Sequence, residues 1–275
     1  LQVYYNKDIL EKHQIKEPTT FEEFIVACEQ LKKVGEEPIT VGVRDGFMIG
    51  WLFANVLESV AGGEAIKELV LGEGKWTDAN IVNASQVLSD WVREEYIPKD
   101  SLTFTFKDSK YSFSNKNSAF IFYGSYQISD FVEQGISDSV GVLTLPSVDR
   151  NVRTKPVGGV GLTWVIPTKT NNQDLAEKWL NFVLSSDYYE VLFADPAYSY
   201  IPAAKISLSI QPNGELLRKI MEEVEFGLSY NPAQFIGPET RSAYFENLQK
   251  LVSQAITPQE TMIKIQAAKE KDLGN

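Results

Sequence analysis

Short segments typical of β-strands alternate with longer segments of helical periodicity, and this alternation constrains the fold more than any other feature of the sequence. Strand-like runs of apolar residues cover residues 1–6, 38–43, 118–123, 140–145 and 158–167. Between and after them, apolar residues recur every three or four positions, as they do on one face of a helix. Strands interleaved with helices in this way are typical of an α/β architecture, so we expect an α/β fold.

Two of the expected helices begin with a capping box, in which a threonine and a glutamate three residues later bond to each other's backbone. The first box, Thr20 with Glu23, begins a helix that Gly35 ends. The second, Thr257 with Glu260, begins the last helix and is followed by proline at the first helical position. Further helices are expected over residues 47–59, 81–92, 174–184, 217–224 and 238–255.

The composition excludes several classes of protein. The 275 residues are 43% apolar, enough to form a core, but no run approaches the roughly 20 apolar residues of a membrane span. A net charge of −11 argues against binding nucleic acid through its phosphates. One cysteine, Cys28, and one histidine, His13, exclude a disulfide framework and a histidine-rich metal site. We expect Cys28 in the core and His13 in a solvated loop or at a helix end, with no metal and no cofactor.

Sequence motifs of the common catalytic sites are missing. The chain lacks the phosphate-binding loop with lysine, the His-Glu-x-x-His motif and the Gly-x-Ser-x-Gly motif. The glycine-rich segment 157–161 lacks the lysine and is followed by strand-like residues, so phosphate binding there is not expected. With 37 Asp and Glu residues, a glycosidase-type carboxylate pair remains an alternative, although no pair stands out by its context.

Aromatic residues make up 12% of the chain, and some of them lie where ligands often bind. Tyr126 follows Gly124-Ser125 at the end of an expected strand, the edge at which open α/β sheets place ligand contacts. Trp164 lies in a glycine-rich segment, and Tyr198 and Tyr200 lie in a loop bounded by proline. Such rings offer flat apolar faces that suit sugar rings, and packing in the core is the alternative for each of them.

Eight short motifs occur in order along nearly the whole chain. They are Tyr-Tyr-Asn-Lys-Asp from residue 4, Pro-Thr-Thr-Phe-Glu-Glu from 18, Phe-Ser-Asn-Lys-Asn-Ser-Ala-Phe from 113, Gly-Ser-Tyr from 124, Gly-Val-Leu-Thr-Leu-Pro from 141, Gly-Gly-Val-Gly from 158, Ala-Glu-Lys-Trp-Leu-Asn-Phe from 176 and Thr-Pro-Gln-Glu from 257. In this order they resemble the family 1 extracellular solute-binding proteins of ABC importers, the maltose-binding-protein-like group. Phe21 replaces the family's usual Trp, and the glycine beside Lys116 is lost.

The resemblance implies a periplasmic-binding-protein-like fold of type II, an α/β fold whose two lobes close around a ligand by hinge bending. Family members carry a further N-terminal lobe, so we expect this chain to be a shortened one. Residues 1–159 correspond to the first part of the C-terminal lobe, residues 160–212 to a hinge and crossover segment that packs on the N-terminal lobe, and residues 213–275 to helices that complete the C-terminal lobe. Apolar residues on the helix of Trp179 are then expected to be exposed or covered by another chain.

The resemblance also implies a set of ligand-binding residues. By position they come from the segment Asp45–Trp51, from Ser125 and Tyr126, and from the stretch Pro238–Phe245 with Arg241 and Tyr244 as candidates. Tyr200 is expected near the hinge or the opposing lobe. Trp51 and Tyr126 are expected to stack on a pyranose ring. Arg241 is expected to donate hydrogen bonds to hydroxyl groups, or to lie on the surface of its helix as an ordinary arginine.

The function implied by the resemblance is non-catalytic binding of an extracellular carbohydrate for delivery to the permease subunits of an ABC transporter. The expected location is the extracellular face of the cytoplasmic membrane or the periplasm. There the protein is peripheral to the membrane, and any lipid anchor lies outside this chain. A carbohydrate-active enzyme and a sensory or interaction module that uses the same lobe remain alternatives.

Overall fold

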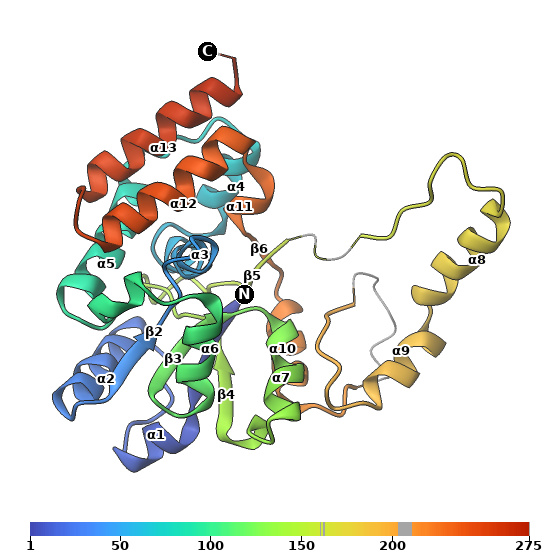
Figure 1. Cartoon of the computed structure of the whole chain (residues 1–275), viewed down its shortest axis with the longest axis horizontal. Helices are drawn as coiled ribbons and strands as arrows, with labels where there is room; N and C mark the ends of the chain where they lie inside the picture. Colours follow the sequence, from blue (N-terminus) through green and yellow to red (C-terminus); the bar gives the residue numbers. More distant parts are fainter. Residues whose placement is uncertain (160, 162, 203–210, 275) are drawn as a thin grey trace.

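A computed structural model describes residues 1–275 apart from 160, 162, 203–210 and 275. The described residues form a sheet with helices on both sides, and a smaller segment that projects away from it (Figure 1). The expected α/β fold is confirmed. Among the described residues, none of the helices combines the length and the apolar character that crossing a membrane requires.

The central sheet has four strands in the order β2-β3-β1-β4. They are β1 (Gln2–Asn6), β2 (Glu37–Thr40), β3 (Ser118–Tyr123) and β4 (Val140–Leu143). Strand β1 runs antiparallel to both of its neighbours, β3 and β4, whereas β2 runs parallel to β3. All four had been expected from the sequence. Residues of β1 and β3 are buried along their whole length, as in a sheet that is covered on both faces.

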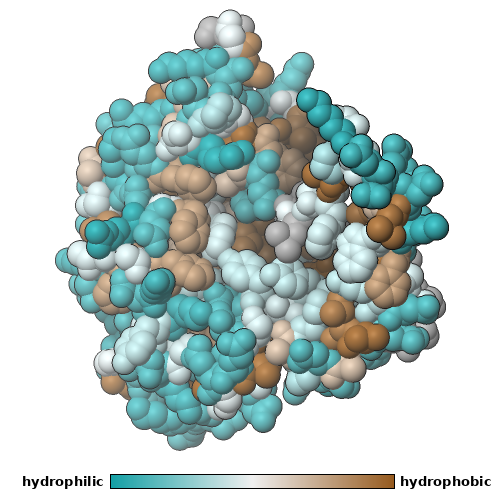
Figure 2. Space-filling view, turned by 45° about the vertical axis from the view of Figure 1, so that its right-hand side comes forward, coloured by the Kyte–Doolittle hydropathy of each residue, from teal (hydrophilic) through white to brown (hydrophobic). Residues whose placement is uncertain are grey.

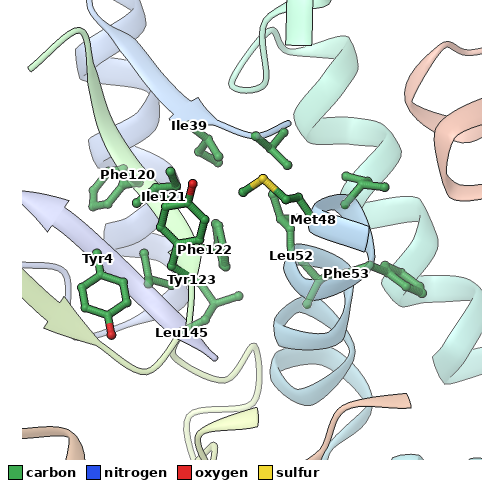
Figure 3. Packing of buried hydrophobic residues seen from close by; sticks show 14 of the residues in the cluster. Tyr4, Ile39, Met48, Leu52, Phe53, Phe120, Ile121, Phe122, Tyr123 and Leu145 are labelled. Atoms are coloured by element: carbon green, nitrogen blue, oxygen red, sulfur yellow. The ribbon is translucent and has the colours of Figure 1, made fainter. Parts of the chain in front are cut away.

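Helix α3 (Phe47–Ala61) packs on one face of the sheet, and the core lies between them. Figure 3 shows Met48 and Leu52 of this helix facing the side chains of Ile39 and Tyr123. Helices α5 (Ala79–Arg93), α12 (Pro238–Val252) and α13 (Pro258–Asp272) lie on the other side of α3, with α12 and α13 side by side (Figure 1). The residues of α3 are apolar on nearly every side, which allows the helix to be enclosed in this way.

Both expected capping boxes are confirmed. The Thr20 side chain accepts a hydrogen bond from the Glu23 backbone at the start of α2 (Phe21–Lys33), and Thr257 does the same for Glu260 in α13. A third box, Thr105 with Asp108, begins α6 (Phe106–Ser114) and was not recognised in the sequence. Shorter helices elsewhere in the chain are α1 (Lys7–Lys12), α4 (Gly63–Leu71), α7 (Ile128–Glu133), α10 (Glu215–Val224) and α11 (Pro232–Phe235). The 3₁₀ turns are η1 (Lys99–Leu102), η2 (Ser125–Gln127) and η3 (Ser137–Ser139).

The strand expected over residues 158–167 is wrong for most of its length. Only β5 (Val157–Gly158) pairs, in parallel with β6 (Ser229–Tyr230), and the described residues that follow are irregular. An apolar run becomes a strand only where another backbone is in reach to pair with it, and here the chain leaves the sheet after two residues. Residues 160 and 162 of the expected strand lie outside the described residues.

Helices α8 (Gln173–Val183) and α9 (Ser186–Phe193) form an arm that projects to the right in Figure 1, away from the sheet. Of the α8 residues only Val183 is buried, whereas Leu175, Trp179 and Phe182 are exposed by 68%, 46% and 46%. The exposure expected for the helix of Trp179 is therefore confirmed. Figure 2 shows hydrophobic patches among hydrophilic surface on the side of the molecule from which the arm projects.

Candidate functional site

Trp51 and Tyr126 lie next to each other, although 75 positions separate them. Trp51 belongs to α3, and Tyr126 to the η2 turn directly after β3. Their ring centroids are 6.2 Å apart and the ring planes meet at 70°, an edge-to-face contact. Both side chains are half-buried, so each keeps part of its ring at the surface. We call the exposed surface of these two rings, at the C-terminal end of β3, the aromatic corner.

Two phenylalanines extend this corner. Phe47 lies one helical turn before Trp51, with ring centroids 4.8 Å apart, and Phe106 of α6 lies 5.8 Å beyond Phe47. Phe47 lies in the segment Asp45–Trp51 expected to contact a ligand but was not singled out, and Phe106 had not been recognised in the sequence. The four-residue spacing from Trp51 was a usable signal for Phe47, since residues four apart share a helix face. Phe106 reaches the corner only through the fold.

Asp45 holds Phe106 in place. One of its carboxylate oxygens accepts a hydrogen bond from the backbone N–H of Phe106, with a distance of 2.6 Å. Asp45 itself is exposed. Asp45, which was expected to bind ligand, thus fixes the first turn of α6. One lone pair of its carboxylate is already used in this hydrogen bond.

Tyr244 lies in the core. Its side chain has no exposed surface, and its hydroxyl donates a hydrogen bond of 2.8 Å to the carbonyl oxygen of Gly50. A methyl group on the α carbon of Gly50 would lie 2.6 Å from Phe245 Cε1 and 2.9 Å from Tyr244 Cε1, so glycine is what allows α12 to approach α3 so closely. Tyr244 is therefore no part of the exposed surface around Trp51. Its neighbour Phe245 is half-buried and packs at Gly46 and Gly50, near the start of α3.

Two further residues expected to bind ligand, Ser125 and Arg241, have polar groups at the surface. Ser125 is half-buried at the start of η2, next to Tyr126. Arg241 is exposed in the first turns of α12, and its Nη2 donates to the carbonyl oxygen of Ile236 at 3.3 Å. The guanidinium therefore has donors left for another partner.

Tyr200, in the segment that follows α9, lies close enough to Tyr126 to affect its ionisation. Burial raises the pKa of the Tyr126 hydroxyl, and the neighbouring Tyr200 hydroxyl raises that pKa further. Tyr200 is 48% exposed, and its ring centroid lies 6.1 Å from that of Tyr198.

The chemistry of this surface is that of flat rings and hydroxyl groups. Within the described ranges, no group of three or more His, Cys, Asp or Glu side chains is arranged to hold a metal ion. Cys28 is fully buried, as expected, and burial raises the pKa of its thiol. His13 lies 2.9 Å from a carboxylate oxygen of Glu36, far along the chain from the aromatic corner.

A separate cavity of about 330 Å³ lies at the end of β4, between the start of α2 and α10. It contains none of the aromatic residues described above. Its cationic side chains each pair with a carboxylate: Arg150 with Glu22, Arg153 with Glu223 and Lys219 with Glu17. Since the charges are matched, this cavity offers no net charge to attract a ligand, and the aromatic corner is the better candidate site.

Comparison with known proteins places the chain among solute-binding proteins. Residues 3–190 match the family described as bacterial extracellular solute-binding protein. An uncharacterized ABC transporter extracellular-binding protein of Pyrococcus horikoshii, PH1214, is 23% identical over 98% of this chain and 60% of its own length. This chain therefore spans about 60% of the length of that curated relative.

Two further proteins show what kinds of relatives the chain has. The multiple sugar-binding protein of Streptococcus mutans is 22% identical over 69% of this chain and 47% of its own length. The solved structure of a chitin oligosaccharide binding protein superposes with a TM-score of 0.84, at 19% sequence identity, over 98% of this chain and 68% of that one. At this identity the superposition establishes the fold, which is the periplasmic-binding-protein-like fold expected from the sequence.

Proposed function

The chain belongs to the bacterial extracellular solute-binding protein family, and from that premise we propose that it binds a carbohydrate for delivery to an ABC-type import permease, without catalysing a reaction. The observation that carries the proposal is the pair of half-buried rings, Trp51 and Tyr126, at one edge of the sheet. Relatives that are named for binding multiple sugars and chitin oligosaccharide support the same class of ligand.

The surface around these rings favours a neutral sugar. A pyranose presents flat C–H faces that pack on aromatic rings and hydroxyl groups that form hydrogen bonds. Ser125 and the hydroxyls of Tyr126 and Tyr200 can exchange such bonds, and Arg241 can donate them. Asp45 already accepts from the Phe106 backbone. With a net charge of −11 over the chain, a neutral ligand meets less repulsion than an anionic one.

The arm supports a division of the protein into two lobes. In this proposal residues 1–159 and 213–275 form one lobe, and residues 160–212 cross to a second lobe that covers α8. An 11-residue helix with one buried residue gains little from packing, and isolated helices of this length are marginal in water. Leu175, Trp179 and Phe182 would then bury their exposed surface against that lobe.

The proposed location follows from the family as well. The protein would act on the extracellular face of the cytoplasmic membrane or in the periplasm, where it would meet the permease subunits. Closing of the two lobes around the sugar would bring Tyr200 towards Tyr126 on the other side of the ligand. No cofactor takes part in binding of this kind.

Thermal unfolding of the chain in the presence of neutral and acidic mono- and oligosaccharides tests the proposal, with product analysis of every sugar that shifts the curve. A sugar that binds only the folded state raises the melting temperature by mass action. We expect neutral oligosaccharides to raise it and to be recovered unchanged. New products would establish an enzyme instead. If no sugar has an effect on this chain or on a longer protein that carries the second lobe, carbohydrate binding is wrong.

A further inference from the structure

Glu58, near the end of α3, is a buried carboxylate with one unused oxygen. Its residue is 3% exposed. Oε1 accepts a hydrogen bond of 2.9 Å from the backbone N–H of Lys155, whereas Oε2 has no hydrogen-bond partner. None of the ion pairs formed among the described residues includes Glu58. A buried carboxylate that keeps its charge is normally paired with a cation or coordinates a metal ion.

Gly63 keeps a small space open beside this carboxylate. A methyl group on its α carbon would lie 3.2 Å from Glu58 Oε2 and 3.4 Å from Ser229 Oγ. Both oxygens therefore border the position that a side chain at Gly63 would take. The preceding residue, Gly62, has φ +81°, a conformation that glycine adopts without strain. Side chains other than hydrogen at Gly63 would fill the space.

Strand β6 brings two more oxygens to this side of the molecule. The backbone of Asn231 is extended, like the strand before it, and residues two apart in an extended segment share a face, which puts Asn231 on the same face as Ser229. The residues are 4% and 5% exposed, and Ser229 Oγ and Asn231 Oδ1 are both without a hydrogen-bond partner. The extended pairing continues through Asn231, whose backbone N–H donates to the Gly158 carbonyl at 2.7 Å.

The charge of Glu58 is not offset by its surroundings. Helix α3 ends and α4 begins on either side of Gly62, so the negative end of one helix dipole meets the positive end of the other and the two largely cancel. The side chain of Lys155 runs towards Gly227, where a methyl group would lie 3.5 Å from its Cδ. What remains is one negative charge among three oxygens that lack partners.

We propose that Glu58, Ser229 and Asn231 bind a calcium ion at the junction of α3, α4 and β6. Carboxylate, hydroxyl and amide oxygens are the hard ligands that Ca²⁺ prefers, and its flexible coordination lets water or backbone carbonyls supply the remaining positions. The ion would join the end of α3 to the strand pair β5–β6, at which the chain leaves the sheet towards the arm. This site is separate from the aromatic corner and does not depend on the identity of the sugar.

Thermal unfolding with calcium tests this site. The chain is freed of metal with a chelator and melted in about 10 mM CaCl₂, above the 10⁻⁴–10⁻³ M range of many extracellular calcium modules, and in NaCl of equal ionic strength. We expect calcium to raise the melting temperature by roughly 3–6 °C over the sodium control. Absence of a calcium-specific rise would mean that the oxygens bind only water, and would overturn the proposal.

Variants show whether the response belongs to this site. Glu58→Gln keeps the size of the side chain and should abolish the calcium response, whereas Glu37→Gln, which alters another carboxylate with a buried unpaired oxygen on β2, should retain it. A calcium response that survives Glu58→Gln or disappears in Glu37→Gln contradicts the assignment. If Glu58→Gln does not fold, calorimetric titration of Asn231→Ala with CaCl₂ replaces it. About tenfold weaker binding supports the site, and unchanged binding rejects it.

Discussion

The rings of Trp51 and Tyr126 meet edge to face at a centroid distance of 6.2 Å, so that a helix and the turn after a strand form one aromatic corner. Each ring holds the other in place, and each remains half-exposed. The contact joins two of the residues expected to bind sugar. Its contribution to binding can be measured separately from its contribution to folding.

We expect Trp51→Ala to weaken binding of the best sugar from the thermal screen by at least about tenfold. Loss of a stacking ring removes both apolar contact and the orientation of Tyr126, worth on the order of 1–3 kcal/mol. Calorimetric titration gives the dissociation constant. Tyr111→Ala is the matched control, since Tyr111 of α6 is 68% exposed and makes no ring contact with the corner. Equal affinities of the two variants would remove Trp51 from the site.

Tyr244→Phe should lower stability and leave sugar affinity unchanged. The substitution deletes the hydroxyl that donates to the Gly50 carbonyl at 2.8 Å, in a fully buried place. A lost buried hydrogen bond costs about 1 kcal/mol, which urea unfolding resolves. A large loss of affinity with unchanged stability would instead return Tyr244 to the binding surface.

Glu37 should make stability depend on pH. Burial raises the pKa of its carboxyl to about 7, and the nearby Asp100 adds to the rise. The folded state therefore holds a proton that the unfolded state releases near its ordinary pKa of about 4.3. The stabilisation is complete below that value and is lost as pH rises through about 7.

The test compares urea midpoints of the chain and of Glu37→Gln at about pH 5 and about pH 8. The neutral amide cannot ionise, so the variant should lose less stability between the two values. Glu36→Gln serves as the contrast. Hydrogen bonds from Lys12 and then His13 lower the pKa of Glu36, and this residue should contribute stability mainly at the higher pH. If both variants follow the wild-type pH profile, neither carboxyl is responsible for it.

The exposed face of α8 should tolerate polar residues in this chain. Leu175→Ser with Phe182→Ser is expected to change the free energy of unfolding by less than about 1 kcal/mol, because Leu175 is mostly exposed and Phe182 is exposed over nearly half of its surface. The same double variant should bind less of a hydrophobic dye and associate less with itself, as light scattering would show. In a protein with the proposed second lobe, the loss of stability should be several-fold larger. Similar losses in both proteins would contradict the two-lobe arrangement.

Much of the fold could be predicted because local signals and tertiary structure agree. Thr20 and Thr257 begin helices through bonds within four residues, and the strands at 118–123 and 140–143 consist almost entirely of apolar residues. Sequence alone reveals such features. The strand expected after Gly158 was wrong because pairing requires a partner backbone, and the sequence does not show where that partner ends.

The candidate site was predicted in part. Trp51 and Tyr126 were each expected to stack on a sugar ring, and the fold brings the two rings into contact, which the sequence did not indicate. Tyr244 and Phe245 are neighbours in the sequence, and only the close packing of α12 on Gly50 decides which of them is buried. Phe106 joins the corner through the hydrogen bond from its backbone to Asp45, across 61 positions, which no local pattern indicates.

The position of β1 in the sheet has a consequence for how this chain folds. The first strand of the sequence lies between β3 and β4, and Tyr4 bonds to Gly124 across a separation of 120 residues. The sheet is therefore incomplete until loops of that length have closed, and until then β1 has no partner for a backbone that ends up fully buried. Such a topology slows folding and leaves an unpaired strand that can aggregate with other chains. The yield of refolded protein should therefore fall as protein concentration rises, and should increase when a chaperone binds the unpaired strand.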